Sequence, residues 1–404
     1  FGTNFQRVYY PKGSLSWVMS DEDWFPRSSI FSHVSSFRAR LAYGASGVQP
    51  GSNTADRTFA ANSGSVKNTD QPYETFNTIG NPNLKPERST EWEGGFDSRL
   101  FNGRFQFDLT YFSRLTHDAL IAAIVAPSLG IGTTTQQRNL GSVKNAGFEL
   151  TFGGQVLDRR NLAIDMQLTS SVIGNKVVSL GGTPTQVGTT NWVAAGYPIR
   201  GLFARPILGW KDKNGDGILT YNADTAKNEV FVGKDTIFRG YAEPRYLTAL
   251  TTGIELFNRK LRLQNLLDWR GGNLWYNNTE RIRCVSRQNC NGLNNPKASF
   301  EEQAMAVATL NDPSHTLDGF FQPGGFVKWR EASATLQLPS ALVSRTRARS
   351  ANLVFSARNL HTWTRYRGTD PESDFQAGEG GDAPAEFQTF AQPTYFILRL
   401  NLGF

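Results

Sequence analysis

The feature that most constrains this sequence is a repeated alternation of apolar and polar residues. Apolar side chains stand at every second position in segments such as 105–111, 148–152 and 162–169, and the last segment alternates up to the final residue. Successive side chains of a strand point to opposite faces, so each segment predicts a strand with one apolar and one polar face. A soluble β-sandwich and a transmembrane β-barrel both produce this pattern.

Segment length favours the barrel. A strand tilted by about 45° needs roughly 9–11 residues to cross a bilayer, whereas soluble strands average about 5–6. The sequence predicts thirteen strands, at 8–19, 34–44, 90–99, 104–114, 146–156, 161–173, 191–198, 201–210, 245–256, 259–270, 326–338, 351–360 and 395–404.

The lengths of the predicted connections alternate as well. If the C-terminus faces the periplasm, one set of connections is 20–33, 100–103, 157–160, 199–200, 257–258 and 339–350. The other set is 45–89, 115–145, 174–190, 211–244, 271–325 and 361–394, and each of its members is longer than every member of the first. Short turns on one side and long loops on the other are typical of an outer-membrane barrel. The predicted fold class is therefore all-β, a transmembrane antiparallel β-barrel with long extracellular loops and short periplasmic turns.

Composition excludes a helical membrane protein, because the mean hydropathy is −0.40 and no run approaches the roughly 18 apolar residues of a spanning helix. The hydrophobic fraction of 39% also argues against wholesale disorder. The chain starts at Phe1 without Met, a basic segment or an apolar segment, so we expect residues 1–404 to be the C-terminal part of a longer protein.

The end of the chain carries a candidate signal. An alternating strand that ends in Phe resembles the C-terminal signal read by the machinery that assembles outer-membrane barrels. The alternative is an ordinary edge strand that ends in Phe by chance. The residues of the candidate signal are Phe396, Leu398, Leu400, Leu402 and Phe404.

Several longer stretches resemble the SusC/RagA family of TonB-dependent outer-membrane transporters. They follow the order of the family over essentially the whole chain, and together they are specific although each is weak alone. The stretches are Leu41–Gly47, Asn81–Glu91 with Glu93–Asp97, Asn139–Glu149, Asp212–Gly217 and Asn359–Glu372.

The resemblance implies a 22-stranded barrel, of which the thirteen predicted strands would be a part. It also implies a plug domain and further strands outside this chain, and a SusD-like surface lipoprotein as partner. The implied function is uptake of large nutrients such as oligosaccharides or peptides, energised through the TonB complex, in the bacterial outer membrane.

One motif has the spacing of a calcium loop. Alternate side-chain oxygens and a backbone carbonyl can surround a hard cation, and Gly217 allows the sharp turn. The twelfth loop position is Ala223, where a calcium loop has Glu, and the next residue could substitute. The alternative is an Asx-rich turn without metal. The candidate ligands are Asp212, Asn214, Asp216, Ile218 and Asp224; no cofactor is required, and calcium would be structural.

The predicted loop 271–325 holds two further candidate sites. Cys284 and Cys290 are the only cysteines, and in an oxidising compartment we expect a disulfide. A metal site would need further Cys or His ligands, which the neighbourhood lacks. Trp275 and Tyr276 could stack on sugar faces, but aromatic residues near strand ends more often form the interfacial girdle.

Two charged stretches have less specific interpretations. Residues 370–386 contain six acidic residues without Lys or Arg, which indicates a solvated extracellular loop or a cation-binding one. The basic run 345–349 falls in a predicted periplasmic turn and lacks the aromatic residues of a single-strand binder, so no nucleic-acid partner is expected.

No enzyme is predicted. The four His residues are scattered, and the sequence contains no HExxH, GxSxG, Walker loop or GxGxxG after a strand. The alternative to a transporter is a secreted or surface all-β adhesin or carbohydrate-binding protein. In the transporter, Asp108, Glu149, Asp165 and Arg399 are predicted from alternation to line the lumen.

Overall fold

A computed structural model of the chain describes residues 9–26, 28, 32–51, 54–125, 135–139, 141–180, 185–187, 190–344, 347–375 and 384–404. Its main feature is one antiparallel sheet of eleven strands, in which each strand pairs with the strands of this sheet that precede and follow it along the chain. The strands are β1 (Lys12–Val18), β2 (Val34–Val48), β5 (Glu87–Leu100), β6 (Phe105–His117), β9 (Ser142–Asp158), β10 (Leu162–Ser179), β17 (Tyr246–Leu256), β18 (Leu261–Gly271), β21 (Phe326–Gln337), β22 (Ser350–Thr364) and β24 (Tyr395–Gly403).

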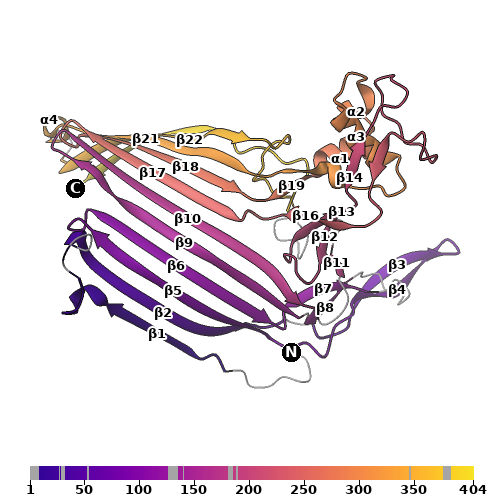
Figure 1. Cartoon of the computed structure of the whole chain (residues 1–404), viewed down its shortest axis with the longest axis horizontal. Helices are drawn as coiled ribbons and strands as arrows, with labels where there is room; N and C mark the ends of the chain where they lie inside the picture. Colours follow the sequence, from indigo (N-terminus) through magenta and orange to yellow (C-terminus); the bar gives the residue numbers. More distant parts are fainter. Residues whose placement is uncertain are drawn as a thin grey trace.

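The sheet is strongly curved and resembles part of a barrel wall (Figure 1). Within the described residues, β1 and β24 each pair with a single strand, so they form the two edges of the sheet. The prediction of an antiparallel β-barrel fold is confirmed. The chain forms part of the barrel wall and does not close it by itself. No described helix is long and apolar enough to cross a membrane.

The number of predicted strands is wrong by two. Segments 191–198 and 201–210 are not wall strands, because they form short pieces of two small sheets within one connection that runs from β10 to β17. Those pieces are β11 (Thr185–Val187), β12 (Asn191–Val193), β13 (Gly201–Ala204), β14 (Ile207–Trp210), β15 (Val230–Val232) and β16 (Ile237–Tyr241). The first predicted strand also begins later, at Lys12.

The sorting of connections by length is confirmed, since removal of a pair of strands leaves the alternation unchanged. The connections at the short end span 19–33, 101–104, 159–161, 257–260 and 338–349; their described residues include a 3₁₀ turn at Met19–Asp21 and α4 at Ser340–Val343. Two of these turns use left-handed backbone, at Phe101, Asn102 and Gly103 and again at Phe257, Asn258 and Arg259. Such residues reverse the chain within a few positions, which keeps this end of the sheet short.

The opposite end carries folded loops. One connection is the hairpin of β3 (Thr58–Val66) and β4 (Thr69–Thr78), and another contains β7 (Leu120–Ile124) and β8 (Thr135–Asn139). The connection from β18 to β21 holds β19 (Leu274–Asn277), α1 (Asn278–Val285), α2 (Asn291–Asn294), α3 (Phe300–Leu310), a 3₁₀ turn (Asp318–Phe320) and β20 (Phe321–Pro323). These elements gather with β14 and β16 beyond the strand ends, far from α4 and the C-terminus (Figure 1).

The two faces of the wall differ in chemistry. Following the register, the rows that contain Phe107, Leu109 and Tyr111 hold Phe152, Leu150 and Phe148 on the next strand. Of these six side chains, Tyr111 and Phe148 are exposed and the other four are partly buried. The alternate rows hold the charged residues. The wall therefore has an apolar outer face and a polar inner face, as expected for strands between lipid and a water-filled lumen.

Candidate functional site

The inner face of the wall carries ion pairs between neighbouring strands. Arg40 lies 2.8 Å from Asp108 and 3.1 Å from Asp97. Farther along the sheet, Arg262 lies 2.7 Å from Asp165. Each of these side chains is partly exposed, so the pairs contribute little to stability and mainly provide a charged, hydrated surface.

The structure places the predicted lumen residues on this face. Asp108 and Asp165 form the pairs described above, and Glu149 borders a depression of about 460 Å³ with Thr169 and Ser171. Arg399 stands opposite Val354 in the register, and Asn401 stands opposite Asn352. These positions alternate with the outward stripe of β24, so Arg399 belongs to the inner face. The alternation pattern therefore predicts the correct face for these four side chains, although they lie on strands far apart in sequence.

A buried cluster of charges lies where the inner face meets the long loops. Lys328 of β21 lies 2.9 Å from Asp370 and 2.8 Å from Glu372, both in the connection from β22 to β24. Arg330 donates to Glu372 over 2.6 Å and 2.8 Å, and it also pairs with Asp268 of β18. We call these residues, together with Arg270, the mouth cluster; its three basic and three acidic groups balance one another.

The electrostatics of the mouth cluster follow from this pairing. Burial raises the pKa of the Glu372 carboxyl, but hydrogen bonds and charge from Arg330 and Lys328 outweigh burial and lower it to about 2. The carboxylate is therefore ionised at any physiological pH. The mouth cluster ties the connection from β22 to β24 against the wall.

The interpretation of the acidic stretch 370–386 as a solvated loop is wrong for its described residues. Asp370 is buried against Lys328, and Glu386 at the end of β23 (Ala385–Glu386) is only 1% exposed. Residues 376–383 lie outside the described residues. The sequence gives no sign that Asp370 and Glu372 are buried, because their basic partners on β21 are remote in sequence.

Glu386 joins two loops through three neighbouring residues. Its carboxylate accepts hydrogen bonds from Tyr366 Oη over 2.6 Å and from Thr279 Oγ1 over 2.9 Å, and also from the backbone N–H of Thr369 over 3.1 Å. Burial, and next the Glu386 carboxylate, raise the pKa of the Tyr366 phenol well above its ordinary value. Sequence reasoning missed Glu386, because nothing local in the sequence shows that it pairs with residue 279.

Trp275 and Tyr276 lie in the core of the loop assembly. Each is 5% exposed on β19, the central strand of a three-stranded sheet with β20 and β23. Tyr276 packs edge-on against Phe321 with ring centroids 5.7 Å apart, and burial raises its pKa to about 12. Both interpretations are therefore wrong, since neither ring is available to a sugar or faces lipid.

Aromatic residues that do fit a girdle lie on the outer face. The ring centroids of Tyr43 and Trp92 are 4.6 Å apart, and those of Tyr111 and Phe148 are 5.0 Å apart. The ring of Tyr246 stacks on that of Trp269. All of them lie toward the long-loop ends of their strands. These girdle residues can be found in the sequence as aromatic residues at the outward-facing positions of each strand. Nearness to a strand end alone did not find them.

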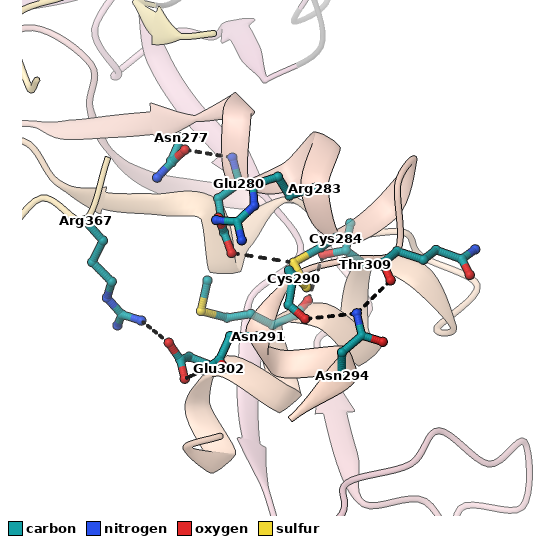
Figure 2. Close-up of a disulfide and its surroundings, with 12 residues drawn as sticks. Asn277, Glu280, Arg283, Cys284, Cys290, Asn291, Asn294, Glu302, Thr309 and Arg367 are labelled. Carbon is teal, nitrogen blue, oxygen red and sulfur yellow. Dashed lines mark hydrogen bonds and ion pairs between the residues drawn. A yellow bond between two sulfur atoms is a disulfide. The ribbon is translucent and has the colours of Figure 1, made fainter. Parts of the chain in front are cut away.

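The structure contains the disulfide between Cys284 and Cys290 (Figure 2). It joins α1 to the residue that precedes α2, and Asn277 caps α1 by accepting from the N–H of Glu280 over 2.9 Å. Ser299 caps α3 by accepting from the N–H of Glu302. Both sulfurs are buried in one apolar cluster with Met305, Ala306 and Phe320. The disulfide thus stabilises a small folded unit within the loop.

The candidate calcium loop is an Asx turn in this structure. Asp212 accepts from the backbone N–H of Gly215 and Gly217, and Asp216 accepts from that of Ile218. Asn214 donates to Asp216 over 2.8 Å. Among the described residues, the carboxylates of Asp212, Asp216 and Asp224 do not converge within 4.8 Å. Asp224 instead accepts from the N–H of Ala226, so the chain does not gather the five candidate ligands.

Glu229, the residue before β15, holds this loop through hydrogen bonds to its backbone. Its carboxylate accepts from the N–H groups of Lys213 and Thr220, over 2.9 Å and 2.8 Å. Burial raises the pKa of the Glu229 carboxyl, but these backbone hydrogen bonds outweigh burial and hold it below the ordinary value. Sequence reasoning missed Glu229 as well, because it lies beyond the span of the motif.

The last strand presents its apolar residues as one outward stripe. Phe396, Leu398, Leu400 and Leu402 pair in register with the outward row of β22 and are 65%, 69%, 56% and 41% exposed. Phe404 follows the strand and is also exposed. The stripe lies on the outer face of β24, and its role as an assembly signal stays a prediction.

Comparison with known proteins agrees with this architecture. The model of the TonB dependent receptor-like β-barrel family matches residues 1–404. TonB-dependent receptor P26 of Formosa agariphila is 21% identical over 98% of this chain and 42% of its own length. TonB-dependent receptor SusC of Bacteroides thetaiotaomicron is 24% identical over 43% of this chain and 17% of its own length. The chain thus spans about two fifths of the first of these relatives.

Among solved structures, the RagAB peptide transporter is similar. It superposes with a TM-score of 0.74 at 18% identity, over 100% of this chain and 44% of that one. The RagAB peptide importer in its open-open state gives a TM-score of 0.71 over the same coverage. At this identity the likeness shows the fold.

Proposed function

Because the chain belongs to the family of TonB dependent receptor-like β-barrels, we propose that it forms part of a SusC/RagA-type transporter that takes up large solutes. Barrels of this kind lie in the outer membrane of Gram-negative bacteria, and this chain does so as well. Eleven wall strands are half of the 22 that the resemblance implies. The remaining wall, the plug and the segment that contacts TonB would come from other parts of the protein.

The observation that supports transport most directly is the contrast between the two faces of the wall. The outer face is apolar and the inner face carries ion pairs such as Arg40–Asp108. An adhesin or a soluble binding protein has no need for an exposed apolar outer face around a polar interior. A hydrated inner wall lets a polar solute pass without loss of its own hydration.

The folded loops would capture the solute and meet the partner. Three connections, from β10 to β17, β18 to β21 and β22 to β24, are joined by partly buried contacts such as Glu386–Thr279 and Arg239–Asp318. The mouth cluster fixes part of this assembly to the wall. We infer that a SusD-like surface lipoprotein covers these loops; support comes from the SusC and RagAB likeness.

The cargo is proposed to be an oligomer such as a peptide or an oligosaccharide. RagAB, which shares the fold, is a peptide transporter, and this supports a peptide. Binding and conformational change suffice for uptake, so the proposed mechanism involves no covalent chemistry. Energy would reach the barrel through TonB acting on the plug.

Uptake by cells that express the complete protein tests the proposal. Cells are given fluorescently labelled oligopeptides in one arm and labelled oligosaccharides in another, with and without a protonophore. We expect one class to accumulate in the periplasm, and the protonophore or loss of TonB to abolish accumulation. Surface binding that neither treatment reduces, without accumulation in the periplasm, would favour the adhesin and contradict transport.

A further inference from the structure

The outer face of the wall is free of charge over most of its height. Following the register from β1 to β24 through the described residues, the outward rows contain no Asp or Glu. Their only Lys and Arg residues are Arg88 on β5, Lys144 on β9 and Lys176 on β10. All three lie at the long-loop ends of their strands; β9 and β10 are neighbours in the sheet, and β6 lies between β5 and β9 (Figure 1).

The parity of these residues is fixed by their neighbours. Lys144 follows the parity of the exposed Phe148, and the register between them is unbroken. The residues next to the two lysines, Asn145 and Asn175, face inward. Asn175 donates a hydrogen bond to Asn145 and accepts one from the backbone N–H of Ile199. Val143 and Val177 are buried on that same inner face. Lys144 and Lys176 therefore point outward.

The cations form one patch without an internal counter-charge. Lys144 stands directly opposite Lys176 in the register, and Arg88 stands opposite His117 of β6. All four side chains are exposed, and in the described part of the chain none has an ion pair or a side-chain hydrogen bond. Like charges directly opposite each other destabilise a sheet. By contrast, inward-facing arginines such as Arg40, Arg114 and Arg262 pair with carboxylates.

The patch lies at the level of lipid headgroups. Strands rise roughly 3.3 Å per residue and tilt by about 40°, so Leu162 to Lys176 spans roughly 35 Å along the barrel axis. The apolar band of such barrels is about 25 Å tall, and headgroups extend beyond it. Just below the patch, Trp92, Tyr111, Phe148 and Val172 present exposed apolar surface to acyl chains.

We propose that Arg88, Lys144, Lys176 and His117 bind the phosphate groups of a phosphorylated glycolipid of the outer leaflet. The basic groups supply the charge that the phosphates need, and the aromatic row beneath contacts the acyl chains of the same molecule. The surface lies on the face opposite the inner wall, so it would hold lipid and not cargo. The proposal does not depend on which solute the protein transports.

Equilibrium binding to a defined lipid tests this site. The complete protein, purified in a non-ionic detergent, is titrated with fluorescently labelled lipid A that carries both phosphates, and anisotropy is measured. We expect salt-sensitive binding, and the Lys144→Gln, Lys176→Gln double variant should lose roughly fivefold in affinity for each lysine. Removal of the phosphates from the lipid should weaken binding to a similar degree.

Matched variants separate a lost site from a damaged protein. The Lys234→Gln, Lys297→Gln pair removes the same charge from exposed loop positions and should bind like the unmodified protein. The Lys144→Arg, Lys176→Arg pair keeps the charge and should keep the affinity. Equal affinity of the double Gln variant, or equal binding of the dephosphorylated lipid, would overturn the proposal. So would displacement by inorganic phosphate at concentrations equal to those of the lipid, which would indicate a site for free phosphate.

Discussion

At the scale of single residues, the mouth cluster joins a loop to the wall through buried charges. Lys328 is 6% exposed and contacts two carboxylates that belong to a different connection. Buried charges depend on their partners far more than exposed ones do. Substitutions here should therefore release the loop without unfolding the wall.

Lys328→Gln should strongly destabilise the docked form of residues 365–375. It leaves the carboxylate of Asp370 buried without its cation, and removal of one partner of a buried pair typically costs about 3–5 kcal/mol. Hydrogen–deuterium exchange of this segment should rise by orders of magnitude while exchange of β17 and β18 stays slow. Arg38→Gln, which breaks an exposed pair with Asp97, is the control and should change exchange little. Unchanged protection in Lys328→Gln would contradict this view of the cluster.

The docking of the same loop should depend on pH only in acid. The pKa of Glu372 is lowered from 4.5 to about 2, so its contribution is fully present above pH 4.5 and is lost as pH falls toward 2. A spin label at Ser373→Cys, where the native side chain is half-buried next to Glu372, should stay restricted from pH 7 to about 4.5 and gain mobility as the pH falls toward 2. A Glu372→Gln background should be mobile already at pH 7. A transition near neutral pH would show that another group controls docking.

Residue-scale prediction from sequence succeeded where the strand itself determines side-chain direction. The outward stripe of β24 and the inward positions of Asp108 and Asp165 follow from alternation alone. Glu229 and Glu386 did not, because their partners come from other parts of the loops. Trp275 was misread for the same reason, since its burial depends on a sheet built from three separate segments.

At the scale of elements, the disulfide should matter locally. Closing a loop of this size contributes about 2 kcal/mol on the chain-entropy view. Cys284→Ala with Cys290→Ala should therefore increase proteolytic cleavage within 278–310 and leave the melting of the wall unchanged. Ser286→Ala, an exposed neighbour, provides the control. Melting of the wall together with the loop would refute an independent loop unit.

Calcium at Asp212, Asn214 and Asp216 stays a prediction. Binding would require the Asx hydrogen bonds of this turn to open, with the side-chain oxygens turning toward the ion. Calorimetric titration of the complete protein should show one calcium site that Asp212→Asn with Asp216→Asn removes. Asp235→Asn, in an exposed turn, should leave it intact. No heat of binding in the unmodified protein would make the turn purely structural.

Two segments that alternate in the sequence are not wall strands. Segments 191–198 and 201–210 alternate like wall strands, yet the structure forms strands of three and four residues there. Short strands pair within a folded loop because the loop has its own core, around Leu202 and Ala242. Alternation alone does not distinguish such a core from a membrane wall.

At the scale of the whole molecule, the division between lipid and lumen can be measured. Leu150→Cys on the outward row and Thr151→Cys on the inward row differ by one position on β9. A lipid-soluble maleimide should label the first, and a water-soluble one the second. Both native cysteines are in a disulfide and do not react. Labelling of Thr151→Cys by the lipid-soluble reagent alone would contradict the assigned faces.

The register of the wall has a consequence for how the protein matures. A strand that paired one residue out of step would turn its inward side chains to the outside, including Arg40, Asp97 and Asp108. An arginine at the bilayer midplane costs about 2–4 kcal/mol, and each strand added to such an error would add further charges. A misregistered strand is therefore less stable in the bilayer than a correctly paired one. The inward-facing charges therefore have a second role. In the finished protein they keep the inner face hydrated, and during insertion the cost of exposing them to lipid favours the correct register of each strand.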